Sequence, residues 1–331
     1  MNLAQKKLKV GVLYPGALLP EKADKPAVIM ADSRHQLTYR QLDAFANRLG
    51  RLFQWRGLKA GQQVVYLCRT RLECLWLQWG AHYAGLRYTF IDPNLAVDRL
   101  RTLLSDCAAN AVVVDGQTPA EVITALRSMA NSPRVYSLDL VAGLPLLEDE
   151  ILAFDTAPLG NALEGMAMAC QMAAGDGPRA LRGDQRPLPL GSTLPPFSLP
   201  ASAADLSDET VYLSLLPHHR YETVKWCQGV SALGGTVVMM TQDAPETILA
   251  TINRYRVSHG VFDEGTFRGL LALPASVRAR YDVSSLRAAV HCAGLGSSQL
   301  AGAMMQWWGP VLYQDQAAVT EAAVTQEMGA V

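Results

Sequence analysis

Apolar positions recur along the first half of the chain in two alternating patterns, one typical of helices and one of short buried strands. A capping box formed by Thr38 and Gln41 opens the first helix, whose apolar face runs from Leu42 to Phe53. Strands are expected at 63–67, 88–91, 111–114 and 134–137, and helices at 71–83, 95–107 and 119–129. Strands that alternate with helices predict a parallel sheet covered on both faces.

The second half repeats this alternation after a gap. Periodicity fades from residue 140 to 208, and residues 182–204, rich in Pro, Gly and Ser, are expected to form a long surface loop. Strands return at 211–216, 236–240, 260–262, 286–292 and 311–313, separated by helices at 221–232, 244–256, 266–273 and 297–308. We therefore expect an α/β protein with two alternating β/α subdomains, at 1–160 and 209–331, whose largely parallel sheets pack together. A phosphate-loop region and a Pro/Gly-rich loop at 161–208 separate them.

Composition narrows the class of protein. The 331 residues are 50% hydrophobic and 18% charged, which suits a globular α/β protein. A net charge of −1 without a basic cluster argues against nucleic acid as the main partner. No apolar run has the length needed to cross a bilayer and no signal peptide opens the chain, so we expect a cytoplasmic protein.

The cysteines and histidines show no metal-binding spacing. Six cysteines are scattered, mostly inside apolar elements, and none forms a Cys-x-x-Cys pair. We interpret them as buried thiols in a reducing compartment rather than as a disulfide framework or a metal site. His218 and His219 are adjacent, so on a strand their side chains would face opposite sides.

The stretch from residue 163 to 181 is the candidate for a phosphate-binding loop. An apolar run enters a turn at Gly175 and Gly177, and Arg179 follows. Glycines let backbone N–H groups approach an anion, and a basic side chain adds a contact. However, residues 166–182 contain no Ser or Thr, and an aspartate lies between the two glycines. The stretch is therefore consistent with a plain turn as well as with an anion site.

Short sequence phrases spread over nearly the whole chain carry a family resemblance. They lie at 37–43 (Leu-Thr-Tyr-Arg-Gln-Leu-Asp), 57–61, 80–85, 91–93, 212–214, 233–238, 254–259, 277–287 and 307–310 (Trp-Trp-Gly-Pro). In order and spacing they resemble the large N-terminal domain of the acyl-CoA synthetase and adenylate-forming (AMP-binding) superfamily. The later phrases most resemble ligases of fatty or aromatic acids. The resemblance implies that domain's fold and an activity in which ATP and magnesium convert a carboxylic acid into an acyl-adenylate. The acyl group then usually passes to CoA or a carrier thiol.

The resemblance also assigns positions to the nucleotide site. In the phosphate loop, matched by residues 171–180, the positional matches are Gly175, Gly177 and Arg179. Arg179 stands where relatives have a lysine, and the Ser and Thr residues of the loop are lost. In the Pro-x-x-His segment of relatives, Arg220 takes the place of the histidine, with His219 beside it.

Further matches lie toward the end of the chain. Gly294 falls in the segment that resembles the adenine-contacting turn of relatives. Thr320 and Glu321 match a phosphate contact and a magnesium ligand, and Glu321 would hold the metal if magnesium-ATP binds. The ribose-binding aspartate and the small C-terminal lid domain, with its catalytic lysine, have no counterpart before Val331 and are expected to be absent.

Three functions stay open at this point. The first is a catalytically impaired homologue without a cofactor, a pseudoenzyme that serves as a partner or scaffold subunit for an active ligase or another enzyme of its pathway. Each lost charge-assisted phosphate contact would weaken ATP binding by about 1.5–3 kcal/mol. The second is an ATP-dependent acyl-adenylating ligase, or half of one, acting on a fatty or aromatic acid, with ATP and magnesium as cofactors.

The third is a protein that binds an acyl ligand, or catalyses a reaction without ATP, in a pocket inherited from the fold. Its polar residues would be His219, Arg220, Glu264 and His291, which lie near expected strand ends, where such folds place ligands. The residues taken one by one favour the simpler interpretation, that each is an ordinary loop or strand-end residue. Across these hypotheses the catalytic candidates are His219, Arg220 and Glu321.

One apolar stretch has two interpretations. The pairs Met304-Met305 and Trp307-Trp308 suit either a partner surface or the buried side of a helix. A surface that relatives cover with their C-terminal domain would be a further interface if it is apolar.

Overall fold

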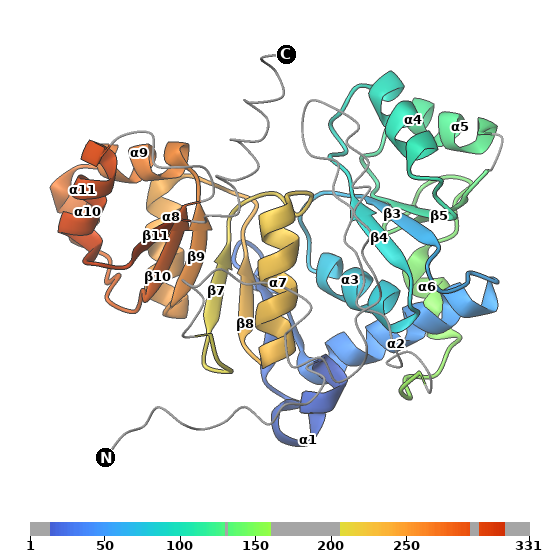
Figure 1. Cartoon of the computed structure of the whole chain (residues 1–331), viewed down its shortest axis with the longest axis horizontal. Coiled ribbons are helices and arrows are strands. Elements are labelled where there is room, and N and C mark those ends of the chain that lie inside the picture. Colours follow the sequence, from blue (N-terminus) through green and yellow to red (C-terminus); the bar gives the residue numbers. More distant parts are fainter. Residues whose placement is uncertain (1–13, 130–131, 160–205, 292–297, 315–331) are drawn as a thin grey trace, which may run out of the picture. The chain divides into compact units, whose positions relative to one another are not determined.

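The computed structural model describes residues 14–129, 132–159, 206–291 and 298–314 (Figure 1). The chain forms two compact units. The first unit contains residues 1–23, 39–68 and 76–198, and the second contains residues 24–38, 69–75 and 199–331. The expected α/β fold with two largely parallel sheets is confirmed.

The first unit is built on a four-stranded parallel sheet in the order β4-β3-β5-β6. Its strands are β3 (Gln63–Leu67), β4 (Arg87–Phe90), β5 (Ala111–Val114) and β6 (Arg134–Ser137). Its helices are η1 (Pro15–Leu18), α1 (Leu19–Lys22), α2 (Tyr39–Trp55), α3 (Glu73–Tyr83), α4 (Val97–Asp106), α5 (Ala120–Ser128) and α6 (Leu147–Leu152), with the first turn of α3 assigned to the second unit. All these elements except η1, α1 and α6 were expected from the sequence pattern, with ends that differ by a few residues.

The two faces of this sheet bury alternate side chains of the same strands. Val65 and Leu67 of β3 pack against α4 and α5 through leucines such as Leu103 and Leu126. Tyr66 lies on the opposite face, where its hydroxyl donates to the Leu77 backbone oxygen of α3 at 2.7 Å. Helices on both faces keep the strands away from water, as a parallel sheet requires.

A buried carboxylate joins four segments of the first unit. The Tyr83 hydroxyl donates to Asp43 Oδ1 at 2.7 Å and accepts from the Gly16 amide at 3.3 Å. Asn47 Nδ2 donates to Asp43 Oδ2 at 2.9 Å, while Asn47 Oδ1 accepts from the Leu159 amide at 3.2 Å. Burial raises the pKa of the Asp43 carboxyl, and the hydrogen bonds from Tyr83 and Asn47 oppose that rise. The network therefore fixes η1, α2, α3 and residue 159 around one polar centre.

The second unit is built on a seven-stranded sheet in the order β11-β10-β9-β7-β8-β1-β2. Its strands are β1 (Pro26–Met30), β2 (Gln36–Thr38), β7 (Val211–Ser214), β8 (Thr236–Met239), β9 (His259–Phe262), β10 (Ala288–His291) and β11 (Leu312–Gln314). Its helices are α7 (Tyr221–Leu233), α8 (Pro245–Tyr255), α9 (Glu264–Ala272), α10 (Ala275–Arg278) and α11 (Ser298–Trp308). Every pairing is parallel except that of β1 with β2.

Helices cover both faces of this sheet as well (Figure 1). Leu213 of β7 faces a core shared with Ile248 of α8, Phe267 of α9 and other side chains of α8, α9 and α11. Tyr212, the preceding residue, faces the other way and stacks on Trp226 of α7, with ring centroids 5.5 Å apart and an interplanar angle of 11°.

Two strands of the second unit were missed by the sequence analysis. β1 and β2 precede residue 39, yet β1 pairs with β8. Lys25 Nζ donates to the backbone oxygen of Gly234 at 2.7 Å, where α7 ends, and also to that of Asp208. The units are therefore not contiguous along the chain, whereas the sequence division placed residues 1–160 together.

The Asp43 network predicts the effect of removing one hydroxyl. The Tyr83→Phe substitution leaves the buried carboxylate and the Gly16 amide each short of a partner, so the free energy of unfolding should fall by about 1–3 kcal/mol. Urea denaturation followed by circular dichroism measures it. The matched control is Tyr313→Phe, since Tyr313 is 39% exposed. Equal stability of the wild type and the Tyr83→Phe variant would contradict the assigned role.

Candidate functional site

The order of strands in the second unit reverses at β7. The next strand in the chain, β8, lies on one side of β7, and β9 lies on the other. In open parallel sheets, ligands bind outside the carboxyl ends of the strands at such a reversal. The candidate site is therefore the carboxyl edge, which we define as residues 215–220 after β7, residues 263–264 after β9 and His291 at the end of β10.

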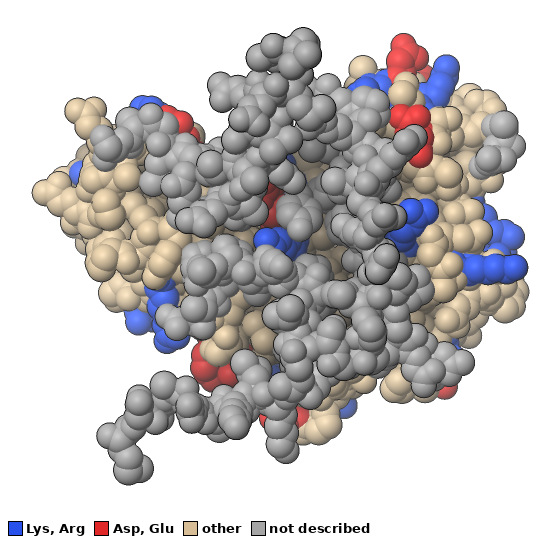
Figure 2. Space-filling model, in the orientation of Figure 1, with Lys and Arg blue, Asp and Glu red and all other residues tan. Residues whose placement is uncertain are grey.

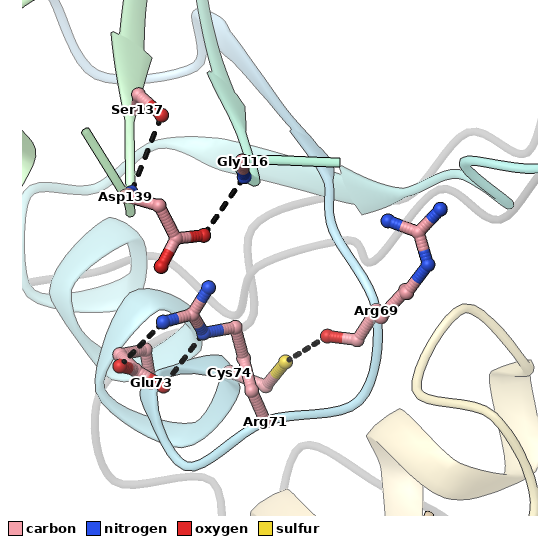
Figure 3. A network of polar contacts seen from close by, with 7 residues as sticks. All are labelled: Arg69, Arg71, Glu73, Cys74, Gly116, Ser137 and Asp139. Carbon is pink, nitrogen blue, oxygen red and sulfur yellow. Dashed lines mark hydrogen bonds and ion pairs between the residues drawn. The ribbon is translucent and has the colours of Figure 1, made fainter. Parts of the chain in front are cut away.

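The strand order of the first unit reverses in the same way at β3. At the carboxyl edge of that sheet, however, loop amides already donate to carboxylates of the same unit. The Gly116 amide after β5 donates to Asp139 Oδ2 after β6 at 2.8 Å (Figure 3). Asp115 Oδ1 accepts from the Gln117 amide at 3.1 Å. Carboxylates bound to loop amides do not favour an anionic ligand, so the second unit offers the better candidate.

A short turn joins β7 to α7 and supplies the basic group of the carboxyl edge. The Arg220 amide donates to the Pro217 backbone oxygen at 3.0 Å, and Arg220 is the residue that precedes the first turn of α7. Its side chain is 49% exposed, and Nε lies 3.6 Å from Glu222 Oε2. A guanidinium beside the amino end of a helix of this length is favourable for binding an anion.

His218 lies in the same turn and is chemically different from Arg220. Its side chain is buried, and its backbone amide donates to Thr70 Oγ1 at 3.0 Å. Burial, with a smaller effect of the neighbouring His219, lowers the pKa of His218 to about 3. The imidazole is therefore neutral at physiological pH. His219 is partly exposed, so the two adjacent histidines have different environments.

The turn after β9 is occupied by helix capping and an exposed ion pair. Asp263 Oδ1 accepts from both the amide and the hydroxyl of Thr266 at 2.7 Å, which caps α9. Glu264 Oε1 accepts from Arg268 one helical turn further on, and both side chains are well exposed. Glu264 thus acts here as a surface residue of α9.

His291 closes the carboxyl edge on the β10 side. Its ring is buried and stacks on Phe267, with centroids 5.7 Å apart and planes 19° from parallel. Burial lowers the pKa of His291, while the charges of Asp263 and Glu264 partly oppose the shift. His291 therefore belongs to the aromatic core beneath the edge as much as to the edge itself.

Two further polar contacts of the second unit were missed by the sequence analysis. The amide and hydroxyl of Thr241 donate to Asp32 Oδ2 at 2.8 and 2.6 Å, joining the ends of β8 and β1. Arg71 donates to both carboxylate oxygens of Glu73 at 2.9 and 3.0 Å, within the segment that also supplies Thr70 (Figure 3). No local pattern pairs residues so far apart in sequence as Asp32 and Thr241.

The structure brings together one group of the sequence candidates. His219, Arg220, Glu264 and His291 all lie on the carboxyl edge. Gly175, Gly177, Arg179, Gly294, Thr320 and Glu321 lie outside the described residues. The nucleotide-binding and magnesium-binding roles of those six positions thus remain predictions.

The described residues were searched for free cysteines, for clusters that could bind a metal ion and for helices that could span a membrane. Among the described cysteines, Cys68, Cys74 and Cys227 are buried free thiols, and Cys107 is a partly buried one. Within the ranges that the structure describes, no group of three His, Cys, Asp or Glu side chains could hold a metal ion. In the same ranges, no helix combines the length and the apolar character needed to cross a membrane.

Comparisons with known proteins give a consistent picture. Residues 19–176 match the family described as AMP-binding enzyme. The chain is 33% identical over 98 residues to the long-chain-fatty-acid–CoA ligase FadD13 of Mycobacterium tuberculosis, a match that covers 30% of this chain and 19% of that protein. Matches to curated relatives span between 2% and 19% of the relatives' length, so they compare only a segment of each.

Solved structures extend the likeness over most of the chain. The N-terminal domain of FACL13 from Mycobacterium tuberculosis superposes with a TM-score of 0.67 at 17% identity, covering 91% of this chain and 73% of that one. The anthranilate CoA ligase AuaEII, in complex with anthranoyl-AMP, gives a TM-score of 0.72 at 18% identity, with 91% and 59% covered. At these identities the likeness shows the fold, which is that of the N-terminal domain of adenylate-forming enzymes.

The environment of His218 predicts a pH dependence of stability. The pKa of His218 falls from 6.5 in the unfolded chain to about 3 in the folded protein. The free energy of unfolding is therefore unaffected by this group above pH 6.5, and it decreases as the pH falls from 6.5 toward 3, because only the unfolded chain then binds the proton. At pH 4.5 the loss should reach about 2–3 kcal/mol. Urea unfolding at pH 7 and 4.5 should show a smaller difference for His218→Gln than for the wild type. His35→Gln, at an exposed histidine, is the control. The same pH difference in wild type and His218→Gln would refute the assignment.

Proposed function

We propose that this homologue of the adenylate-forming (AMP-binding) enzymes activates a carboxylic acid with ATP, as the part of such a ligase that resembles the N-terminal domain. The observation that carries the proposal is the carboxyl edge, where Arg220 and the amino end of α7 follow the central strand at the reversal of strand order. Both are suited to an anionic ligand. The match of residues 19–176 to AMP-binding enzymes supports the nucleotide as that ligand.

The residues at the edge fit phosphate groups. Arg220 can donate from a planar guanidinium, and the first amides of α7 are not used within the helix. ATP would supply the adenylyl group, and magnesium would offset the charge of its phosphates. Neutral His218 adds no charge to the edge, so Arg220 is the cation that this turn offers to an anion.

The acid is proposed from the relatives. FadD13 is named as a ligase of long-chain fatty acids, and AuaEII as a ligase of anthranilate, an aromatic acid. A fatty or an aromatic carboxylic acid is therefore the substrate class that we propose. A second chain or a further part of the same polypeptide would complete the ligase if adenylation needs a lid domain.

A second candidate function is that of a catalytically impaired partner or scaffold subunit. The sequence of residues 166–182 favours it, because the hydroxyl side chains of the phosphate loop are lost. The pairing of Arg220 with Glu222 favours it too, since a carboxylate competes with phosphate for the guanidinium. The partner would be an active ligase or another enzyme of the same pathway.

Calorimetry of ATP with magnesium on the full chain separates the two candidates. The proposed activity predicts micromolar binding, together with ATP–pyrophosphate exchange in the presence of fatty or aromatic acids. Arg220→Ala should weaken ATP binding about tenfold, because one partly exposed charge-assisted contact is lost. Arg101→Ala, which removes an exposed guanidinium from α4, should leave the affinity unchanged.

The contrary result is equally clear. If ATP does not bind at about millimolar concentration, adenylation by this chain is excluded and the role of an impaired partner subunit takes its place. Binding that is identical in the wild type and the Arg220→Ala variant would retain the activity but remove Arg220 from the site.

A further inference from the structure

The outer helix α11 resolves the two interpretations of the Met and Trp pairs. Met304 is fully buried and Trp308 is 8% exposed, and both belong to the core of the second unit. Met305 is 46% exposed and Trp307 is only partly buried. Trp307 also packs against that core, so Met305 is the member of the two pairs that is well exposed. Its exposure needs an explanation that core packing does not provide.

The outward side of α11 has no charged residue. Its exposed positions are Gln299, Gly302, Met305 and Gln306. Surface helices ordinarily carry charged residues on the side that faces water, so an uncharged one suits a contact with another molecule. A Cβ atom added to Gly302 would meet nothing within 4 Å. The backbone at Gly302 is therefore open to close approach.

An unpaired arginine lies beside this surface. Arg278 of α10 stacks over the Trp307 ring, with its guanidinium carbon 4.8 Å from the ring centroid. Its Nε is buried and has no hydrogen-bond partner, and no described carboxylate forms an ion pair with it. A buried N–H without an acceptor is costly, and a carboxylate from another molecule could satisfy the guanidinium on the stacked face.

Arginines outnumber carboxylates around this surface, although Asp282 and Glu246 form ion pairs with Arg256 and Arg280. Residues 275–314 contain three arginines and a single acidic residue, Asp282. Asp282 Oδ2 already accepts from Arg256 at 2.8 Å. Arg280 is 62% exposed, and its nearest carboxylate, that of Glu246, lies 3.6 Å away. Basic groups thus flank an uncharged, partly apolar strip. In Figure 2 the part of the molecule over α10 and α11 is mostly tan, with few charged atoms.

We propose that the α10–α11 surface, defined by Arg278, Arg280, Gly302, Met305 and Trp307, docks an acidic amphipathic helix of a partner protein. Apolar side chains of that helix would cover Met305 and Trp307, and its carboxylates would bind the arginines. Gly302 admits the close approach of the helix. This docking is independent of ATP binding, so it holds whether or not the chain adenylates an acid.

A second copy of the same chain fits this surface less well. In a two-fold contact the same patch meets itself, so the excess of arginines over carboxylates on one copy would face the same excess on the other. A basic helix is excluded by the same repulsion. The charge balance therefore selects an acidic occupant.

The probe is a fluorescein-labelled synthetic helix of about 18 residues, with Leu along one side and Glu along the other. Fluorescence anisotropy should show saturable binding to the full chain. Met305→Glu and Arg278→Glu should each weaken that binding at least about tenfold. Arg101→Glu, an equal charge change on the exposed side of α4, should not change it. A peptide with Lys in place of every Glu should not bind.

Three results would overturn the proposal. The first is no saturable binding of the acidic helix below about 1 mM. The second is equal binding by the wild type and both surface variants, with circular dichroism showing that these variants are folded. The third is a wild-type dimer in gel filtration that Met305→Glu converts to a monomer, since a second copy would then be the occupant.

Discussion

A parallel sheet must be covered on both faces, and this constraint organises both units. Strands such as β7 and β8 are short and wholly apolar at their centres, so neither face can meet water. Helices α8, α9 and α11 bury one face of the second sheet, and α7 buries the other. Because connections between parallel strands are right-handed, helices move to the opposite face only where the strand order reverses. The requirement for burial therefore also sets the place of the candidate site.

The sequence predicted most elements because their signals are local. Apolar runs, a capping box and turn glycines lie within a few residues of the elements that they define. β1 was missed although its apolar run is equally clear, and its place in the second sheet could not be expected, because its partner β8 is far along the chain. Lys25 and Gly234 are 209 residues apart, and no periodicity relates them.

The candidate site was predictable only in part for the same reason. His219 and Arg220 follow an obvious strand, so their place at a strand end could be expected. The state of His218 could not, since it depends on burial and on Thr70, 148 residues away. Glu264 and His291 were placed correctly near strand ends, but their partners, Arg268 and Phe267, direct them toward a surface ion pair and the core.

The two sheets show how little of the chemistry follows from topology. The order β4-β3-β5-β6 of the first matches β8-β7-β9-β10 of the second, so each has a reversal at its leading strand. At the first edge, Asp115 and Asp139 accept from loop amides. At the second, an arginine and a helix amino end stand in the equivalent place. Identical topology thus carries different side chains, and the few residues after each strand decide which ligand is favoured. An anionic ligand is consequently expected at the turn after β7, where Arg220 lies beside the amino end of α7.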